Sequence, residues 1–367
     1  MSEPLNLQAD CCRQRQQRLV DVMKERSIDQ VVVVSHDNVQ WLTGFRPHRL
    51  MSAVALLDSE GKCVLVAPNA EPEDVAADEI LTFEAQWCAT LRQEQLQSAA
   101  EQLSRTDINV SGRTGFEASN SSDHVLSLFG DDRVDVDAEI WKLRRRKLDD
   151  ELAMIRLSIA CTHAMYINAR EIIEPGISEL EVFNQLHAAA VDVAGEPLTA
   201  IGNDYQCNSP GGPPRDRRAQ AGELFILDLG PAVRGYYADN CRSFAVDRKP
   251  TDLQLETWQS IVDVLSMVEA TVRPGVSCRD LYQQAKDTLD QVRPDAFFHH
   301  LGHGFGIFPH EAPHLNPNWD DKFEEGDVFT AEPGLYFDGL NAGIRLEQNY
   351  RVTADGVERL TSFPLEL

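Results

Sequence analysis

The chain has 367 residues, a length that favours two domains at roughly 100–200 residues per domain. Hydrophobic residues make up 43% and charged residues 25% of it, which is typical of a globular protein and excludes a disordered one. The net charge of −25 argues against a nucleic-acid partner, because phosphates would be repelled, and it suits a protein that collects divalent cations.

The N-terminus has no apolar segment of signal-peptide length, and the longest aliphatic run, residues 31–34, is too short to span a bilayer. We therefore expect a cytoplasmic protein without membrane association. The eight cysteines form no CxxC pair, so we expect thiols rather than disulfides or zinc ligands.

The first part of the chain predicts an α/β domain. Leu19, Val22 and Met23 are the apolar positions of a helix over 14–26, and a β-branched run predicts a buried strand over 30–34. The elements expected next are a turn-rich stretch at 38–45, strands at 53–57 and 63–67 around a turn at 58–61, a helix at 93–103, and short strands at 109–110 and 133–136.

A basic-then-acidic stretch at 141–150 lacks apolar periodicity, and we place a domain boundary just before it, which gives domains 1–138 and 139–367. The second domain opens with a helix–Pro-Gly–helix pattern that recurs about 100 residues later and is compatible with an internal duplication. The four helices are expected at 148–174, 179–194, 258–271 and 279–291.

Two aspartates follow apolar segments of the second domain. An apolar run from residue 224 predicts a buried strand that delivers Asp228 at its end, before a glycine. Asp239 follows on the next strand, after a turn at 233–235, and a hairpin of this length can bring both carboxylates together. The alternative is that Asp239 caps a turn.

Four histidines lie close together in one glycine-rich segment: His299, His300, His303 and His310. The glycines around His303 allow close backbone approach on both sides, so we interpret His303 as a metal ligand. His310 is then a nearby acid/base or oxyanion stabiliser. His299 and His300 have the alternative of structural hydrogen bonding.

Two glutamates complete the set. Glu332 comes at a strand end that Pro-Gly stops, and Glu347 is expected on a strand. Arg345 shares a strand face with Glu347, so it can orient a carboxylate or neutralise excess negative charge.

Four carboxylates and one imidazole exceed the needs of a single zinc site, which usually has more nitrogen or sulfur. The set suits two cations that share bridging carboxylates, with Mn²⁺ the first choice and Co²⁺ or Zn²⁺ as alternatives. Two such metals about 3.5–4 Å apart can activate one water and polarise a carbonyl. The reaction class is hydrolysis of an amide-like C–N bond.

These residues resemble the pita-bread metallopeptidase superfamily (peptidase family M24), in the branch of prolidase and aminopeptidase P, over nearly the full length. The motifs in family order are Asp228-Leu-Gly, Asp239, Gly302-His303-Gly-Phe-Gly with His310-Glu311, Thr330-Ala-Glu332-Pro-Gly and Arg345-Leu-Glu347. The segment Asn38-Val-Gln-Trp-Leu-Thr-Gly-Phe45 is similar to a family motif of the first domain. The resemblance implies a creatinase-like α/β N-terminal domain followed by a pita-bread domain with a curved antiparallel sheet flanked by helices.

The resemblance also implies roles for residues. The dinuclear ligands would be Asp228, Asp239, His303, Glu332 and Glu347. Glu347 would bridge the metals and handle the proton of the attacking water, His310 would contact the substrate and steady the tetrahedral intermediate, and Arg345 and His300 would help to bind substrate. The family further implies a homodimer in which the N-terminal domain of one subunit closes over the other's site.

One position departs from the family. Gly211 stands in the stretch 210–217, where the pattern has a histidine that helps to hold substrate. Loss of one preorganised donor typically costs about 10²–10³ in rate, so another group replaces it or the substrate differs. The candidates for replacement are His300, His314, and His36 or His48 from either subunit.

Three functions remain open from the sequence. The leading hypothesis is a metal-dependent Xaa-Pro dipeptidase or aminopeptidase that acts on small peptides. The second is a repurposed metalloenzyme of the same family, acting on a small non-peptide C–N substrate or as a lyase because of Gly211. The third is a non-catalytic binding homologue.

Overall fold

The structure, a computed structural model, describes residues 5–107 and 112–367. Contacts between residues divide the chain into two units. The N-terminal unit runs to Arg144 and also takes 148–150, while the C-terminal unit takes 145–147 and everything from Glu151 onward. The predicted boundary near residue 138 stays a prediction.

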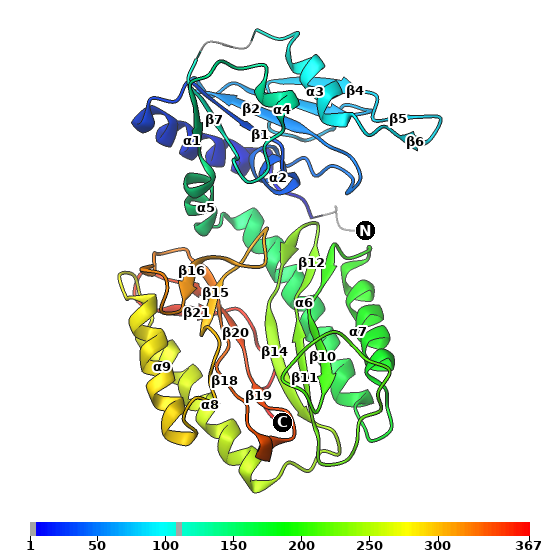
Figure 1. The fold of residues 1–367 in the computed structure, drawn as a ribbon, viewed down its shortest axis with the longest axis vertical. Helices are drawn as coiled ribbons and strands as arrows, with labels where there is room; N and C mark the ends of the chain where they lie inside the picture. The colour runs from blue at the N-terminus through cyan, green and yellow to red at the C-terminus, as the bar shows by residue number, and fades with distance from the viewer. Residues whose placement is uncertain (1–4, 108–111) are drawn as a thin grey trace. The chain divides into compact units, whose positions relative to one another are not determined.

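The N-terminal unit contains a mixed sheet of six strands in the order β4-β3-β2-β1-β7-β8 (Figure 1). The central pairs β1–β2 and β2–β3 are antiparallel, and the outer pairs β3–β4, β1–β7 and β7–β8 are parallel. Its strands, with a separate β5–β6 hairpin, are β1 (Gln30–Val33), β2 (Val54–Asp58), β3 (Cys63–Pro68), β4 (Glu79–Phe83), β5 (Gln86–Trp87), β6 (Thr90–Leu91), β7 (Thr114–Phe116) and β8 (Arg133–Asp135).

The helices of this unit are α1 (Ala9–Arg26), α2 (His36–Thr43), α3 (Gln95–Leu103), α4 (Asp123–Leu126) and α5 (Asp137–Arg145). The prediction of a turn-rich stretch at 38–45 is wrong, because α2 occupies most of it. The Ser35 side chain caps this helix by accepting the Asn38 N–H, and Gly44 ends it at φ +81°. The strand predicted at 109–110 lies outside the described residues.

Two helix pairs form the outside of the C-terminal unit. Figure 1 shows α6 and α7 beside β10, β11 and β12, and α8 and α9 beside the strands that follow β15. The pairs are α6 (Asp149–Ile172) with α7 (Glu179–Ala194), and α8 (Asp252–Thr271) with α9 (Cys278–Val292). Each pair packs its apolar face into its own core cluster. The four helices predicted from the sequence are therefore all present.

The strands of the C-terminal unit pair antiparallel throughout the described residues. Their sheets have the orders β10-β11-β14, β13-β12-β9, β16-β15-β17-β20-β21 and β18-β19. The strands are β9 (Ala200–Ile201), β10 (Asp204–Cys207), β11 (Leu224–Leu229), β12 (Pro231–Val233), β13 (Tyr236–Tyr237), β14 (Asn240–Ala245), β15 (Gly302–Gly304), β16 (Glu311–Leu315), β17 (Val328–Ala331), β18 (Gly334–Leu335), β19 (Ile344–Arg345), β20 (Gln348–Val352) and β21 (Val357–Arg359), with a short helix η1 (Asp338–Leu340).

The observed architecture confirms the predicted fold class: an α/β N-terminal unit, then antiparallel strands flanked by helices. None of the helices within 5–107 and 112–367 is both long and apolar enough to cross a membrane. One local difference concerns Glu347, which was expected on a strand. It lies instead in the short connection between β19 and β20.

Candidate metal centre

Asp228 and Asp239 come together through the pairing of β11 with β14. Asp228 is the fifth residue of β11, and its neighbour Leu229 pairs with Asn240, the first residue of β14. Asp239 immediately precedes Asn240, so the register places it beside the end of β11. The turn between β12 and β13, at 234–235, closes the intervening loop as predicted.

Glu347 joins these two aspartates. Carboxylate oxygens of Asp228, Asp239 and Glu347 all lie within 4.8 Å of one another. Glu347 is only 1% exposed. Its Oε1 accepts a hydrogen bond from the Thr330 hydroxyl, while its Oε2 is buried and has no hydrogen-bond partner. A buried carboxylate oxygen left in this way is available to a cation or a water.

His303 connects the aspartates to Glu332. Its Nε2 lies 3.5 Å from Asp239 Oδ2 and 3.6 Å from Glu332 Oε1. Glu332 directly follows β17, and its N–H donates to the Leu301 carbonyl over 2.8 Å. The five residues expected as ligands therefore gather in one place, from β11, β15 and the ends of β14, β17 and β20.

The glycines around His303 allow neighbouring backbones to approach β15. A Cβ on Gly302 would lie 1.9 Å from the Thr330 carbonyl oxygen, and one on Gly304 would lie 2.1 Å from that of Ala312. Both distances are much shorter than any allowed contact between a carbon and an oxygen atom. Only glycine therefore fits on either side of His303.

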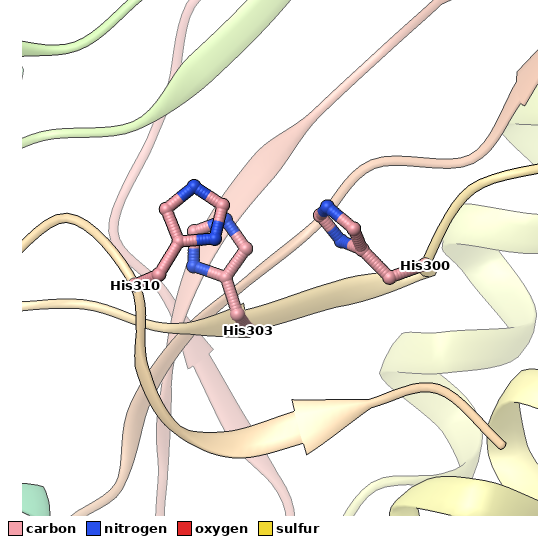
Figure 2. A group of neighbouring side chains, drawn as sticks. All are labelled: His300, His303 and His310. Atoms are coloured by element: carbon pink, nitrogen blue, oxygen red, sulfur yellow. The ribbon is translucent and has the colours of Figure 1, made fainter. Parts of the chain in front are cut away.

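Two further histidines flank His303 (Figure 2). The His310 ring stacks on His303, with centroids 3.7 Å apart and planes at 16°. His300, three residues before His303, places its Nδ1 3.2 Å from Glu332 Oε1. The three histidines present ring nitrogens within 4.8 Å of one another, and His310 is the exposed member. The imidazoles thus form one wall of the centre.

His299 has the structural role that was its alternative. Its Nε2 lies 3.0 Å from the Tyr336 hydroxyl, and its Nδ1 lies 2.8 Å from the His300 carbonyl oxygen. Tyr336 also accepts a hydrogen bond from Arg345 Nη1 at 3.2 Å. His299 and Tyr336 therefore fix the position of Arg345.

Arg345 is bound to two carboxylates at once. Its Nη2 donates to Asp228 Oδ2 at 2.9 Å and also to Asp204 Oδ2. Asp204 was not predicted as a site residue. It opens β10 and pairs with Asp228 in β11, so only the strand register brings it to the centre. The strand Asp-Tyr-Gln-Cys alternates polar and apolar residues, but its four residues carry no motif that marks Asp204 as a site residue.

Gly211, the position that departs from the family pattern, lies against the Asp204 side chain. A Cβ on Gly211 would lie 2.4 Å from Asp204 Oδ2. Of the candidates to replace the expected imidazole, His300 lies at the centre, whereas His314 is bound to Asp321 over 2.8 Å and stacks on Trp319. His36 and His48 belong to the N-terminal unit.

Burial and mutual repulsion shift the acids of the centre toward their protonated forms. Burial raises the pKa of Asp228 to about 6, although Arg345 opposes the rise. Burial also raises the pKa of Glu332 to about 8, and the charge of Asp228 adds to this. The pKa values of Asp239 and Glu347 rise well above the ordinary range, first through burial and then through the neighbouring carboxylates.

The residues fit divalent cations. The buried carboxylates lie close together and their pKa values are raised, so their negative charge is not fully offset. Arg345, the guanidinium beside Asp228, does not supply enough positive charge for all of them. The unpartnered Glu347 Oε2 and an imidazole in the same cluster supply ligand atoms of the kinds that first-row divalent metals accept. Burial and the charge of His310 lower the pKa of His303 well below its ordinary value, which favours the neutral ring that a metal ligand requires.

Two protein-family models match the chain, one over each of its two parts. The family model described as Metallopeptidase family M24 matches residues 153–354, and the model described as Creatinase/Prolidase N-terminal domain matches residues 15–145. A Xaa-Pro dipeptidase of Pyrococcus horikoshii is 25% identical over 362 residues, which cover 98% of this chain and 99% of that protein.

Solved structures match over almost the whole chain. The prolidase from Pyrococcus horikoshii superposes with a TM-score of 0.82 at 23% identity, over 96% of this chain and 99% of the other. A Xaa-Pro dipeptidase from Bacillus anthracis superposes with a TM-score of 0.81 at 23% identity, over 97% and 99%. At this level of identity the superpositions show a shared fold, which confirms the creatinase-like and pita-bread architecture.

Proposed function

The chain belongs to metallopeptidase family M24, and on that premise we propose that it is a metal-dependent peptidase that cleaves Xaa-Pro bonds. The single observation that carries the proposal is the gathering of Asp228, Asp239, His303, Glu332 and Glu347 around one buried spot. The name of the Pyrococcus relative, a Xaa-Pro dipeptidase, supports the choice of bond.

We further propose that these five residues hold two divalent cations, with Mn²⁺ the first choice because oxygen ligands dominate. When bound, such a pair lowers the pKa of a shared water and polarises the scissile carbonyl. The family resemblance also supports a homodimer, which light scattering would test. We propose a cytoplasmic location as well, which localisation of a tagged chain would test.

The chain's own residues supply the remaining chemistry. Glu347 handles the proton of the attacking water, which is passed to the leaving nitrogen. His310 lies on the exposed side of the histidine wall, where its ring can donate to the carbonyl oxygen as charge develops. Arg345 holds Asp228 in place and offsets part of the negative charge.

A second candidate keeps the metals and changes the substrate. The specific observation is that Asp204 fills the space beside Gly211, so this side of the centre has a carboxylate where the family pattern has an imidazole. A small non-peptide C–N substrate, or a lyase substrate, is the alternative.

The experiment is a hydrolysis assay on a panel of Xaa-Pro dipeptides, their amides and longer Xaa-Pro peptides. Protein loaded with Mn²⁺ or Co²⁺ should release the residue before proline, and chelator-treated protein and the His303→Ala variant should not. Failure of the fully metal-loaded protein to cleave any peptide of the panel would contradict the proposal and favour the second candidate.

A further inference from the structure

The carboxylate of Asp204 occupies the space that a side chain at position 211 would need. A Cβ on Gly211 would lie 2.4 Å from Asp204 Oδ2 and 2.7 Å from its Cγ, which are both far inside contact distance. On the same turn, the Gly212 N–H donates to Asp204 Oδ1 over 2.7 Å. Asp204 therefore both excludes a side chain at 211 and holds the turn that carries it.

The oxygen of Asp204 that a Cβ at position 211 would meet, Oδ2, also accepts a hydrogen bond from Arg345 at the metal centre. Arg345 Nη2 binds Asp204 and Asp228 together, so a single guanidinium nitrogen links the acid beside Gly211 to an expected metal ligand. The Asp204 side chain is 18% exposed, whereas that of Arg345 is 10% exposed. The carboxylate, more than the guanidinium, is thus the charged group that this wall offers to an incoming molecule.

We propose that Asp204 and Gly211 act as a coupled pair that selects against substrates with a carboxylate next to the scissile bond. The inference rests on the proposed Xaa-Pro peptidase function and names its substrate class: peptides in which proline is followed by a further residue or an amide. A free dipeptide places its carboxylate one residue from the cleaved bond, close to the fixed charge of Asp204.

The physical basis is like-charge repulsion in a partly desolvated site. Arg345 offsets only part of this repulsion, because its Nη2 is shared by Asp204 and Asp228 and its Nη1 donates to Tyr336. A neutral amide in the same place meets no such repulsion and can donate a hydrogen bond to Asp204 instead.

The steric half of the proposal is tested by thermal unfolding, which needs no activity. Gly211→Ala should lower the melting temperature by about 3–10 °C, because overpacking is costly in a fixed site. Gly176→Ala is the matched control, since Gly176 also has positive φ but nothing lies within 4 Å of its Cβ position. Adding Gly211→Ala to Asp204→Ala should cost no more than the control. Equal shifts for the two single glycine variants would overturn the coupling.

The charge half is tested with alanyl-proline and alanyl-prolinamide, which differ only at the carboxyl group. Metal-loaded wild type should favour the amide by about tenfold or more in kcat/KM, and Asp204→Asn should narrow that ratio to about twofold. Equal cleavage of both by wild type would overturn the inference and leave the proposed function intact. If neither is cleaved, calorimetric binding of proline and prolinamide to the loaded protein decides: tighter binding of prolinamide supports the inference, and tighter or equal binding of proline overturns it.

Discussion

Replacement of Glu347 by glutamine should change stability in opposite directions with and without metal. In metal-free protein, Glu347 lies in a cluster whose carboxylate oxygens are within 4.8 Å of one another. Two unit charges at that distance repel by about 3.5 kcal/mol at an effective dielectric constant of about 20, and partial protonation reduces this to about 1–2 kcal/mol. Glu347→Gln removes one of these charges, so the metal-free variant should melt about 2–8 °C above metal-free wild type.

Bound metal should reverse the order of the two melting temperatures. A cation at about 100 times its Kd stabilises wild type by about 2.7 kcal/mol, or about 5–11 °C for a unit of this size. The amide that Glu347→Gln introduces binds a divalent cation far more weakly than a carboxylate, so the variant should gain only a small part of that shift. The assay is calorimetric or fluorescence-monitored unfolding of both proteins, once in chelator and once in excess Mn²⁺.

A matched control is Glu325→Gln, because Glu325 is exposed. Its melting temperature should equal that of wild type both in chelator and in excess Mn²⁺. The reasoning is refuted if Glu347→Gln destabilises the metal-free protein as much as the loaded protein, or if Mn²⁺ leaves the melting temperature of wild type unchanged.

Three further predictions concern the residues around the ligands. Arg345→Lys, which loses the planar fork that reaches Asp228, should weaken metal affinity by about 10–100-fold in a competition titration, and unchanged affinity would contradict a positioning role. His310→Ala should lower kcat by about 10²–10³-fold without lowering metal content, and a loss of metal instead would make His310 a ligand. Glu179→Gln should flatten the acid limb of stability: burial opposes ionisation of Glu179, but hydrogen bonds from Arg215 hold its pKa below the ordinary value of 4.5, so its contribution is present above pH 4.5 and is lost as pH falls below that value through the lowered pKa. Parallel melting curves for variant and wild type across that range would count against it.

The main elements of the fold could be predicted from the sequence because the spacing of the apolar residues agreed with the positions of the residues that begin and end helices and strands. Helix α7 was expected over the same residues it occupies, since Ser178 and Glu181 form a capping box and Gly195 ends the helix in a left-handed conformation. Helix α2 could not be recognised, because its polar and β-branched residues have weak helix propensity. Six of its residues, from Asn38 to Thr43, are buried, so tertiary packing overrides that propensity.

The candidate site was predictable where a residue sits at a strand end or in a distinctive motif, as for Glu332 before Pro-Gly. Asp204 was not, because its place depends on the antiparallel register that sets it opposite Asp228. A histidine at position 211 would collide with Asp204, so Gly211→His alone cannot restore the family pattern.

The most direct test of the central claim is anomalous diffraction from crystals of the Mn²⁺-loaded protein. A dinuclear centre should give two anomalous peaks about 3.5–4 Å apart, bounded by Asp228, Asp239, His303, Glu332 and Glu347. A single peak, no peak, or manganese bound away from these five side chains would contradict it.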